Sequence, residues 1–116
     1  MMQGFRMSGR KVFVTVFVAI SAGCFLVPNL AGQSQSGRDV YLDKCAVCHG
    51  EDGAGKTIKG KKVHCKDIRD TIKKDSEADM IKVATDGKGV NMDSYKKQFS
   101  PEQIRAAVEY YRSLAK

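Results

Sequence analysis

Two cysteines and a histidine at fixed spacing are the feature that most constrains this chain of 116 residues. Cys45 and Cys48 lie three positions apart, and His49 follows the second cysteine directly. This spacing is typical of covalent haem attachment, in which two thiols add across the porphyrin vinyl groups. The adjacent imidazole is then carried beneath the ring, within reach of the iron. We therefore predict one haem c held by Cys45 and Cys48, with His49 as the proximal iron ligand.

Two other kinds of site are compatible with cysteines at this spacing. A zinc site has four candidate ligands in Cys45, Cys48, His64 and Cys65. However, His64 and Cys65 are adjacent and lack the usual gap of three to five residues, so both cannot easily reach one tetrahedral ion. A thioredoxin-like redox pair requires a preceding strand and a βαβ pattern, and the sequence shows neither. Haem attachment is therefore the preferred interpretation.

Length and charge set further limits. A chain of this length has room for one domain, and a core this small is naturally completed by a bound cofactor. The formal net charge is +7, from 20 Lys and Arg against 13 Asp and Glu. Arg6, Arg10 and Lys11 lie near the N-terminus, and the other 17 basic residues leave a charge of +4. This mild balance gives little support for nucleic-acid binding, which usually shows a stronger basic stripe.

An export signal is predicted at the N-terminus. Its basic residues precede an uncharged apolar run over residues 12–27, which Pro28 and small residues follow. This order of basic, apolar and small-residue regions is typical of a secretory signal peptide. We expect cleavage at about residues 31–34, which divides the chain into a signal peptide (1–33) and a mature domain (34–116). The predicted location is therefore periplasmic.

Two membrane-bound alternatives remain for this segment. Residues 12–31 are just long enough to span a bilayer as a retained anchor, although Pro28 and the polar residues after it argue against this. Residues 21–24 resemble a bacterial lipoprotein cleavage site ending in Cys24, but the apolar residues after the cysteine do not fit it well. Membrane association is therefore expected only if the segment is retained or lipidated.

Helical signals dominate the rest of the chain. Residues 36–45 are predicted to form a short, capped first helix. A capping signature at Ser76 begins a second helix, and Ser100 followed by Pro101 begins a third with apolar residues at helical spacing. Residues 50–60 are rich in glycine and are predicted to form a loop rather than a regular element. With no convincing strand pattern, the predicted class is all-α, with three to four short helices around one haem.

A six-coordinate haem iron needs a second axial ligand, and three residues compete for this role. Met92 lies in a glycine-flanked loop over residues 87–95, where a thioether can approach the iron from the face opposite His49. His64, the other histidine of the chain, is the alternative. Met80 has helical spacing to apolar neighbours and fits a core residue better than a ligand. We therefore predict Met92 as the distal ligand, with His64, then Met80 or an open site, as the alternatives.

The pattern resembles that of a small class I, single-haem cytochrome c of the bacterial type over residues 36–116. In that family an aromatic residue lies four positions before the first haem cysteine and a glycine four positions before the aromatic, as Tyr41 and Gly37 do here. The final helix of the family supplies an apolar and an aromatic residue to pack against them, which Val108 and Tyr111 match. The resemblance implies the cytochrome c fold, haem attachment outside the cytoplasm and a close crossing of the first and last helices.

The leading functional hypothesis is an exported carrier of single electrons between redox partners, with His49 and Met92 bound in both oxidation states. Because no substrate is bound and no bond is made, an enzyme is not expected. Many members of the family have proline directly after the ligand methionine, whereas this chain has Asp93. If this loop releases Met92, the alternative is a haem-based binder or sensor of diatomic gases.

Two further features concern reactivity and partners. Cys65 is interpreted as a small buried thiol rather than a reactive one. A run of lysines without an intervening acid is either a solvated face or a surface that steers the protein toward an acidic partner. This lysine run comprises Lys56, Lys59, Lys61, Lys62 and Lys66. The expected partners are therefore transient redox proteins, with acidic docking surfaces if the lysine run steers docking, and not nucleic acid.

Overall fold

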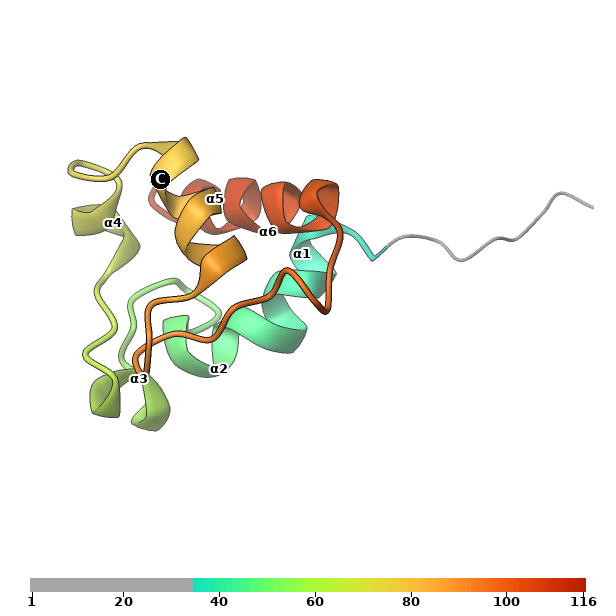
Figure 1. Ribbon diagram of the computed structural model, residues 1–116. Helices are drawn as coiled ribbons and strands as arrows, with labels where there is room; N and C mark the ends of the chain where they lie inside the picture. Colours follow the sequence, from blue (N-terminus) through green and yellow to red (C-terminus); the bar gives the residue numbers. More distant parts are fainter. Residues whose placement is uncertain (1–34) are drawn as a thin grey trace, which may run out of the picture. The chain divides into compact units, whose positions relative to one another are not determined.

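The computed structural model describes residues 35–116, and this part of the chain is helical (Figure 1). Its elements are α1 (Gly37–Val40), the π-helical turn η1 (Tyr41–Cys45), α2 (Ala46–His49), α3 (Ile58–Lys62), α4 (Ile68–Thr71), α5 (Glu77–Asp86) and α6 (Pro101–Ser113). The described residues form no strand, apart from an isolated bridge between Lys88 and Val90. The predicted all-α class is confirmed, whereas the predicted signal peptide (1–33) lies outside the described residues. Within the described part, no helix has the length and apolar character that crossing a membrane requires.

The segment formed by α1, η1 and α2 is continuous and carries the haem-attachment motif at its end. Ser36 begins it, because the Ser36 Oγ accepts a hydrogen bond of 3.2 Å from the backbone N–H of Asp39. The segment runs through His49 and stops at Gly50, whose φ of 81° favours glycine. The helix predicted for residues 36–45 therefore continues to His49, because no helix-breaking residue occurs before Gly50.

The helices α5 and α6 begin where their capping signatures predict. Ser76 accepts a hydrogen bond from the backbone of Asp79, and the Asp79 carboxylate accepts one from the backbone of Ser76 in return. Ser100 and Gln103 form the same reciprocal pair at the start of α6, with Pro101 in its first turn. Each capping box satisfies two backbone donors that helix geometry leaves free, so these local signals set both helix starts.

Two short helices, α3 and α4, add to the predicted set. Thr57 caps α3, because its Oγ1 accepts a hydrogen bond of 2.9 Å from the backbone N–H of Gly60. Gly60 is accommodated inside the helix for a packing reason, since a Cβ there would overlap the carbonyl oxygen of Cys48. Asp67 caps α4 with its side chain in a similar way. The prediction of a loop over residues 50–60 is therefore wrong at its end, where α3 begins.

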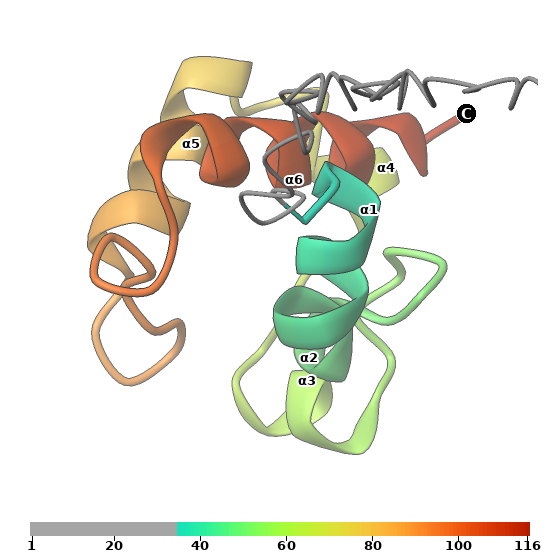
Figure 2. The ribbon, with the colours of Figure 1, turned by 90° about the vertical axis from the view of Figure 1, so that its right-hand side faces the viewer.

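The first and last helices cross at short range and lie next to each other in both ribbon views (Figure 1 and Figure 2). At the crossing, a Cβ on Gly37 would overlap the carbonyl group of Ala106 in α6, so this position requires glycine. One turn later, the rings of Tyr41 and Tyr111 stack with their centroids 5.6 Å apart, and Tyr110 packs against Tyr41 at 5.3 Å. The close crossing and the Tyr41–Tyr111 pairing implied by the resemblance are confirmed.

Two clusters of buried residues form the core. Their buried members are Val40, Tyr41, Ala46 and Ala107 in the first cluster and Ile68, Met80 and Val108 in the second. Tyr111 and Leu114 pack against both clusters, so the C-terminal part of the chain joins them. Val108, which with Tyr111 is implied by the resemblance to pack against Gly37 and Tyr41, lies in the second cluster, while Ala107 contributes to the first.

Candidate haem-binding site

A cavity of about 660 Å³ brings the predicted haem residues together. In Figure 2, α2 and α3 lie on one side of the fold and α5 with its following loop on the other, and residues from both sides line the cavity. The volume is in the range of small-molecule and cofactor sites. The predicted attachment residues and candidate ligands on its wall are Cys45, Cys48, His49, His64, Met80 and Met92.

The two attachment cysteines are both partly buried at the cavity wall. Burial, assisted by the neighbouring Cys48, raises the pKa of the Cys45 thiol to about 11. This thiol is therefore protonated at neutral pH, and a protonated thiol is a poor nucleophile. The position of the pair at the cavity wall suits attachment to a cofactor bound in the cavity.

His49 ends α2 with its imidazole at the cavity wall. Burial lowers the pKa of His49, so the ring is neutral and retains a lone pair for a metal ion. The ring of Tyr111 lies 4.7 Å from the imidazole, centroid to centroid, and restricts its rotation. On another side, the Nδ1 atom of His49 lies 3.0 Å from the Sγ of Cys65. Because Nδ1 is engaged by the protein, Nε2 is the nitrogen that is free to bind iron.

Met92 reaches the same cavity from the loop between α5 and α6 and is partly buried. Its carbonyl oxygen accepts a hydrogen bond of 2.7 Å from the backbone N–H of Lys88. Nearby, the hydroxyl of Ser94 donates a hydrogen bond of 2.6 Å to the carbonyl oxygen of Thr85 in α5. These contacts fix the loop against the end of α5, although Asp93 stands where many cytochromes of the class have proline.

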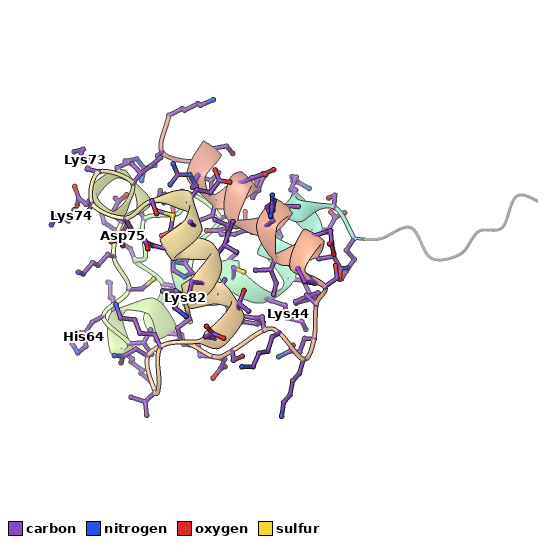
Figure 3. The ribbon with its side chains drawn as sticks, turned by 45° about the horizontal axis from the view of Figure 1, so that its top comes forward. Lys44, His64, Lys73, Lys74, Asp75 and Lys82 are labelled. Atoms are coloured by element: carbon purple, nitrogen blue, oxygen red, sulfur yellow. The ribbon has the colours of Figure 1, made fainter. Side chains whose placement is uncertain are left out.

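The other two candidate ligands have different surroundings. Met80 is only 8% exposed and belongs to the buried cluster around Ile68, with its sulfur 3.6 Å from Nη1 of Arg112. His64 is exposed, and Figure 3 shows it at the outer edge of the molecule beside α3. Both residues border the cavity, but Met80 is held in the core and His64 lies on the outside.

Residues to which the sequence assigned no role also support the motif. The hydroxyl of Thr57 donates to the carbonyl oxygen of Cys48 at 3.0 Å and so secures the end of α2. The hydroxyl of Tyr95 lies 3.4 Å from the carbonyl oxygen of Lys44, which connects the Met92 loop to η1. The capping pattern that begins with Thr57 is a signal that sequence reasoning can use. No local pattern predicts the contact of Tyr95 or that of Cys65.

The donor set at the cavity fits a covalently attached haem. The thiols of Cys45 and Cys48, the imidazole of His49 and a methionine thioether on its wall make the combination found in c-type cytochromes with His/Met ligation. The candidate zinc ligands Cys45, Cys48, His64 and Cys65 also line this cavity, but they are not close enough together to form a metal site. Across residues 35–116, no group of three or more His, Cys, Asp or Glu side chains is arranged to hold a metal ion.

Comparison with known proteins bears directly on this site. The family model described as "Cytochrome C oxidase, cbb3-type, subunit III" matches residues 32–110. The chain belongs to this family of c-type cytochromes. A search of curated proteins gave no match to this cytochrome.

Solved structures of c-type cytochromes have the same fold. The KustC0563 c-type cytochrome is 27% identical with a TM-score of 0.66, and the match covers 71% of this chain and 100% of that one. The c-type cytochrome XoxG from Methylobacterium extorquens AM1 is 26% identical with a TM-score of 0.53, over 68% of this chain and 48% of its own. This protein is therefore a single-haem cytochrome of the all-α class that binds haem c covalently, and its chemistry is haem-based electron transfer.

Proposed function

We propose that this cytochrome is an exported carrier of single electrons in which His49 and Met92 are the axial ligands of the haem iron. The observation that carries the proposal is the position of Met92 on the cavity that also contains the haem-attachment motif. Of the competing residues, Met80 is packed in the core and His64 is exposed beyond α3. Met92 is thus the candidate that reaches the cavity without a competing structural role.

The residues of the chain hold, orient and shield the cofactor. Cys45 and Cys48 would hold it through thioether bonds, and His49 would bind its iron through Nε2. Bound haem supplies a ferric–ferrous couple. Ligation by one thioether and one imidazole gives this couple a higher midpoint potential than ligation by two more basic groups. Val40 and Ile104, both buried at the cavity wall, exclude water from the ring. The proposal includes no bond-making step and hence no enzymatic activity.

A carrier works best when its two ligands stay in place, and contacts on both sides of the cavity support this. The His49 ring is confined by Tyr111, and the Met92 loop is bonded to the end of α5. The contact between the Tyr95 hydroxyl and the carbonyl oxygen of Lys44 links these two sides of the site. Ligands held in this way change little on oxidation or reduction, because the protein has already fixed their positions.

Visible absorption spectra of the oxidised and reduced protein, purified after periplasmic expression, test the ligand assignment. We expect the bands of covalent c-type haem together with the weak far-red band of methionine ligation. Met92→Ala should abolish the far-red band, whereas Met80→Leu, a matched change in the core, should retain it. Loss of the band in Met80→Leu and its retention in Met92→Ala would contradict the proposal.

Exposed lysines gather around the cavity and support transient docking to acidic redox partners. Lys59 and Lys66 of the lysine run border the cavity, as does Lys88 on the opposite loop. All five lysines of the run are exposed, and none forms an ion pair with another described residue. Val90, which is 97% exposed, adds an apolar contact point at the same cavity. Free positive charge around an apolar patch favours an encounter with an acidic surface.

Export to the periplasm is proposed from the N-terminal order of basic, apolar and small residues. The mass and N-terminal sequence of the purified haem protein test it, and we expect a chain that begins between residues 31 and 34. A chain that begins at a lipidated Cys24, or one that keeps residues 12–27 in the membrane fraction, would replace this proposal with one of the anchored alternatives.

A further inference from the structure

The thiol of Cys65 contacts the histidine of the haem-attachment motif. The Cys65 Sγ lies 3.0 Å from Nδ1 of His49, although 16 positions separate the two residues. When Nε2 of a histidine binds a metal, Nδ1 carries a proton and needs an acceptor. We propose that Cys65 is a positioning residue that accepts the hydrogen bond from Nδ1 and thereby sets how strongly His49 donates to the iron. This inference rests on the proposed role of His49 as the proximal ligand.

The neighbours of the thiol indicate the direction of the hydrogen bond. Besides Nδ1 of His49, the Cys65 Sγ has the carbonyl oxygen of Lys66 at 4.0 Å. A carbonyl oxygen only accepts, so the thiol proton is directed weakly toward Lys66 and the sulfur lone pairs face His49. Among the described residues, Cys65 is the hydrogen-bond partner of the His49 ring. The orientation of the proximal ring therefore depends on this sulfur.

The backbone around the contact holds both partners in place. The N–H of Gly55 donates a hydrogen bond of 2.8 Å to the carbonyl oxygen of His49, and a Cβ on Gly55 would lie 2.8 Å from the carbonyl oxygen of Cys65. The N–H of Cys65 donates a bond of 2.8 Å to the carbonyl oxygen of Gly60 within α3. Gly55 thus packs against both residues of the pair, and its φ of 68° makes this close approach favourable only for glycine.

The kind of acceptor has a consequence for the haem. Sulfur is a weak acceptor, so the Nδ1 proton stays largely on His49. A stronger acceptor would make the imidazole more basic and favour ferric iron, which lowers the midpoint potential. Loss of the acceptor has the opposite effect. Cys65 is therefore expected to hold the potential between these two limits.

Midpoint potentials of haem-loaded variants test this role. We expect Cys65→Ala, which removes the acceptor, to shift the potential upward. Cys65→Ser, whose hydroxyl still accepts, should have a potential at or below that of the wild type. Ile58→Ala changes an exposed residue of α3 that does not line the cavity and should leave the potential unchanged. Equal potentials in wild type, Cys65→Ala and Cys65→Ser, or a common shift in all three variants, would overturn the inference.

A measurement on the unaltered protein provides an independent test that does not depend on how the variants fold. In the reduced protein labelled with ¹⁵N-histidine, the Nδ1–H resonance of His49 should exchange slowly with solvent and show a nuclear Overhauser contact to the β-protons of Cys65, and absence of that contact would contradict the inference. Exchange as fast as that of an exposed imidazole would overturn the inference. This result is independent of the Met92 assignment. A missing far-red band would refute Met92 as a ligand, whereas the Nδ1–H signal of His49 tests only the contact with Cys65.

Discussion

At the scale of single residues, His64 shows strain outside the haem contacts. Its φ of 56° is in the left-handed region, where a side chain is unfavourable by about 1 kcal/mol or more. The N–H of His64 bonds to the carbonyl of Lys61 at 3.3 Å and the N–H of Cys65 to that of Gly60 at 2.8 Å. These two bonds form a Schellman motif, in which glycine usually occupies the position of His64.

His64→Gly is therefore expected to stabilise the protein. The relief of backbone strain exceeds the added freedom of the unfolded chain, for a net gain of about 0.5–1 kcal/mol in the free energy of unfolding. Urea unfolding measures this gain, and Lys61→Gly inside α3 is the control, expected to lose about 1 kcal/mol. The far-red band should persist in His64→Gly. Because this band marks methionine ligation, its absence already in the wild type, together with a changed haem spectrum in His64→Gly, would mean that His64 is the distal ligand.

At the scale of elements, the crossing of α1 and α6 positions the haem motif. Gly37 meets the backbone of Ala106 at this crossing, and the same continuous segment ends twelve residues later with His49. The Tyr41 hydroxyl donates a hydrogen bond of 2.6 Å to the carbonyl of Gly50, which fixes the far end of the segment. A change at the crossing therefore affects the segment that carries Cys45, Cys48 and His49.

Gly37→Ala is expected to destabilise the protein by about 1–3 kcal/mol, because the added methyl group forces the two helices apart. Denaturant unfolding of the haem-loaded protein measures this loss. Arg38→Ala, an exposed change at the next position, should stay within about 0.5 kcal/mol of wild type. If the two variants were equally stable, the crossing would not be as tight as described.

The start of α5 makes a pH-dependent contribution to stability. Hydrogen bonds from the Ser76 hydroxyl and the Ser76 backbone N–H hold the pKa of Asp79 below its ordinary value of 3.8. Because the carboxyl has a lower pKa in the folded than in the unfolded protein, its contribution is complete above 3.8 and is lost as the pH falls through the folded-state value.

Comparison of wild type with Asp79→Asn isolates this contribution. The difference in the free energy of unfolding should be largest near neutral pH and should close in acid, because asparagine resembles the protonated carboxyl. Asp67 and Asp86, whose pKa values are also lowered by hydrogen bonds, are present in both proteins and cancel. A difference that stays constant with pH would show that the Asp79 charge does not stabilise α5.

At the scale of the whole molecule, the range of an interaction along the chain determines whether sequence reasoning finds it. The haem motif and the starts of α5 and α6 are predicted because their signals span a few residues. The contacts of Cys65 with His49 and of Tyr95 with Lys44 have no local signal, since they join residues 16 and 51 positions apart. The helix capped by Thr57 is missed for another reason. Gly60 favours a loop by its local preference, and only its close packing against Cys48 in α2 explains why a glycine lies inside this helix.

The charge distribution of the molecule leads to a prediction about its partners. Electron transfer to an acidic redox protein should slow as ionic strength rises from about 0.01 to 0.5 M, because salt screens the attraction. Lys59→Glu, beside the cavity, should lower the rate at low salt more than Lys74→Glu, which makes the same charge change elsewhere (Figure 3). A rate that does not depend on salt would exclude steering by the lysine run.

The central claim is that Met92 remains bound opposite His49 in the working protein, which makes this cytochrome a carrier rather than a gas binder. Addition of carbon monoxide to the reduced protein tests this claim most directly. The account predicts little spectral change in the wild type, because the sixth position is filled, and a large change in Met92→Ala. A large change in the wild type at the same concentration would contradict the claim and favour a haem-based gas binder.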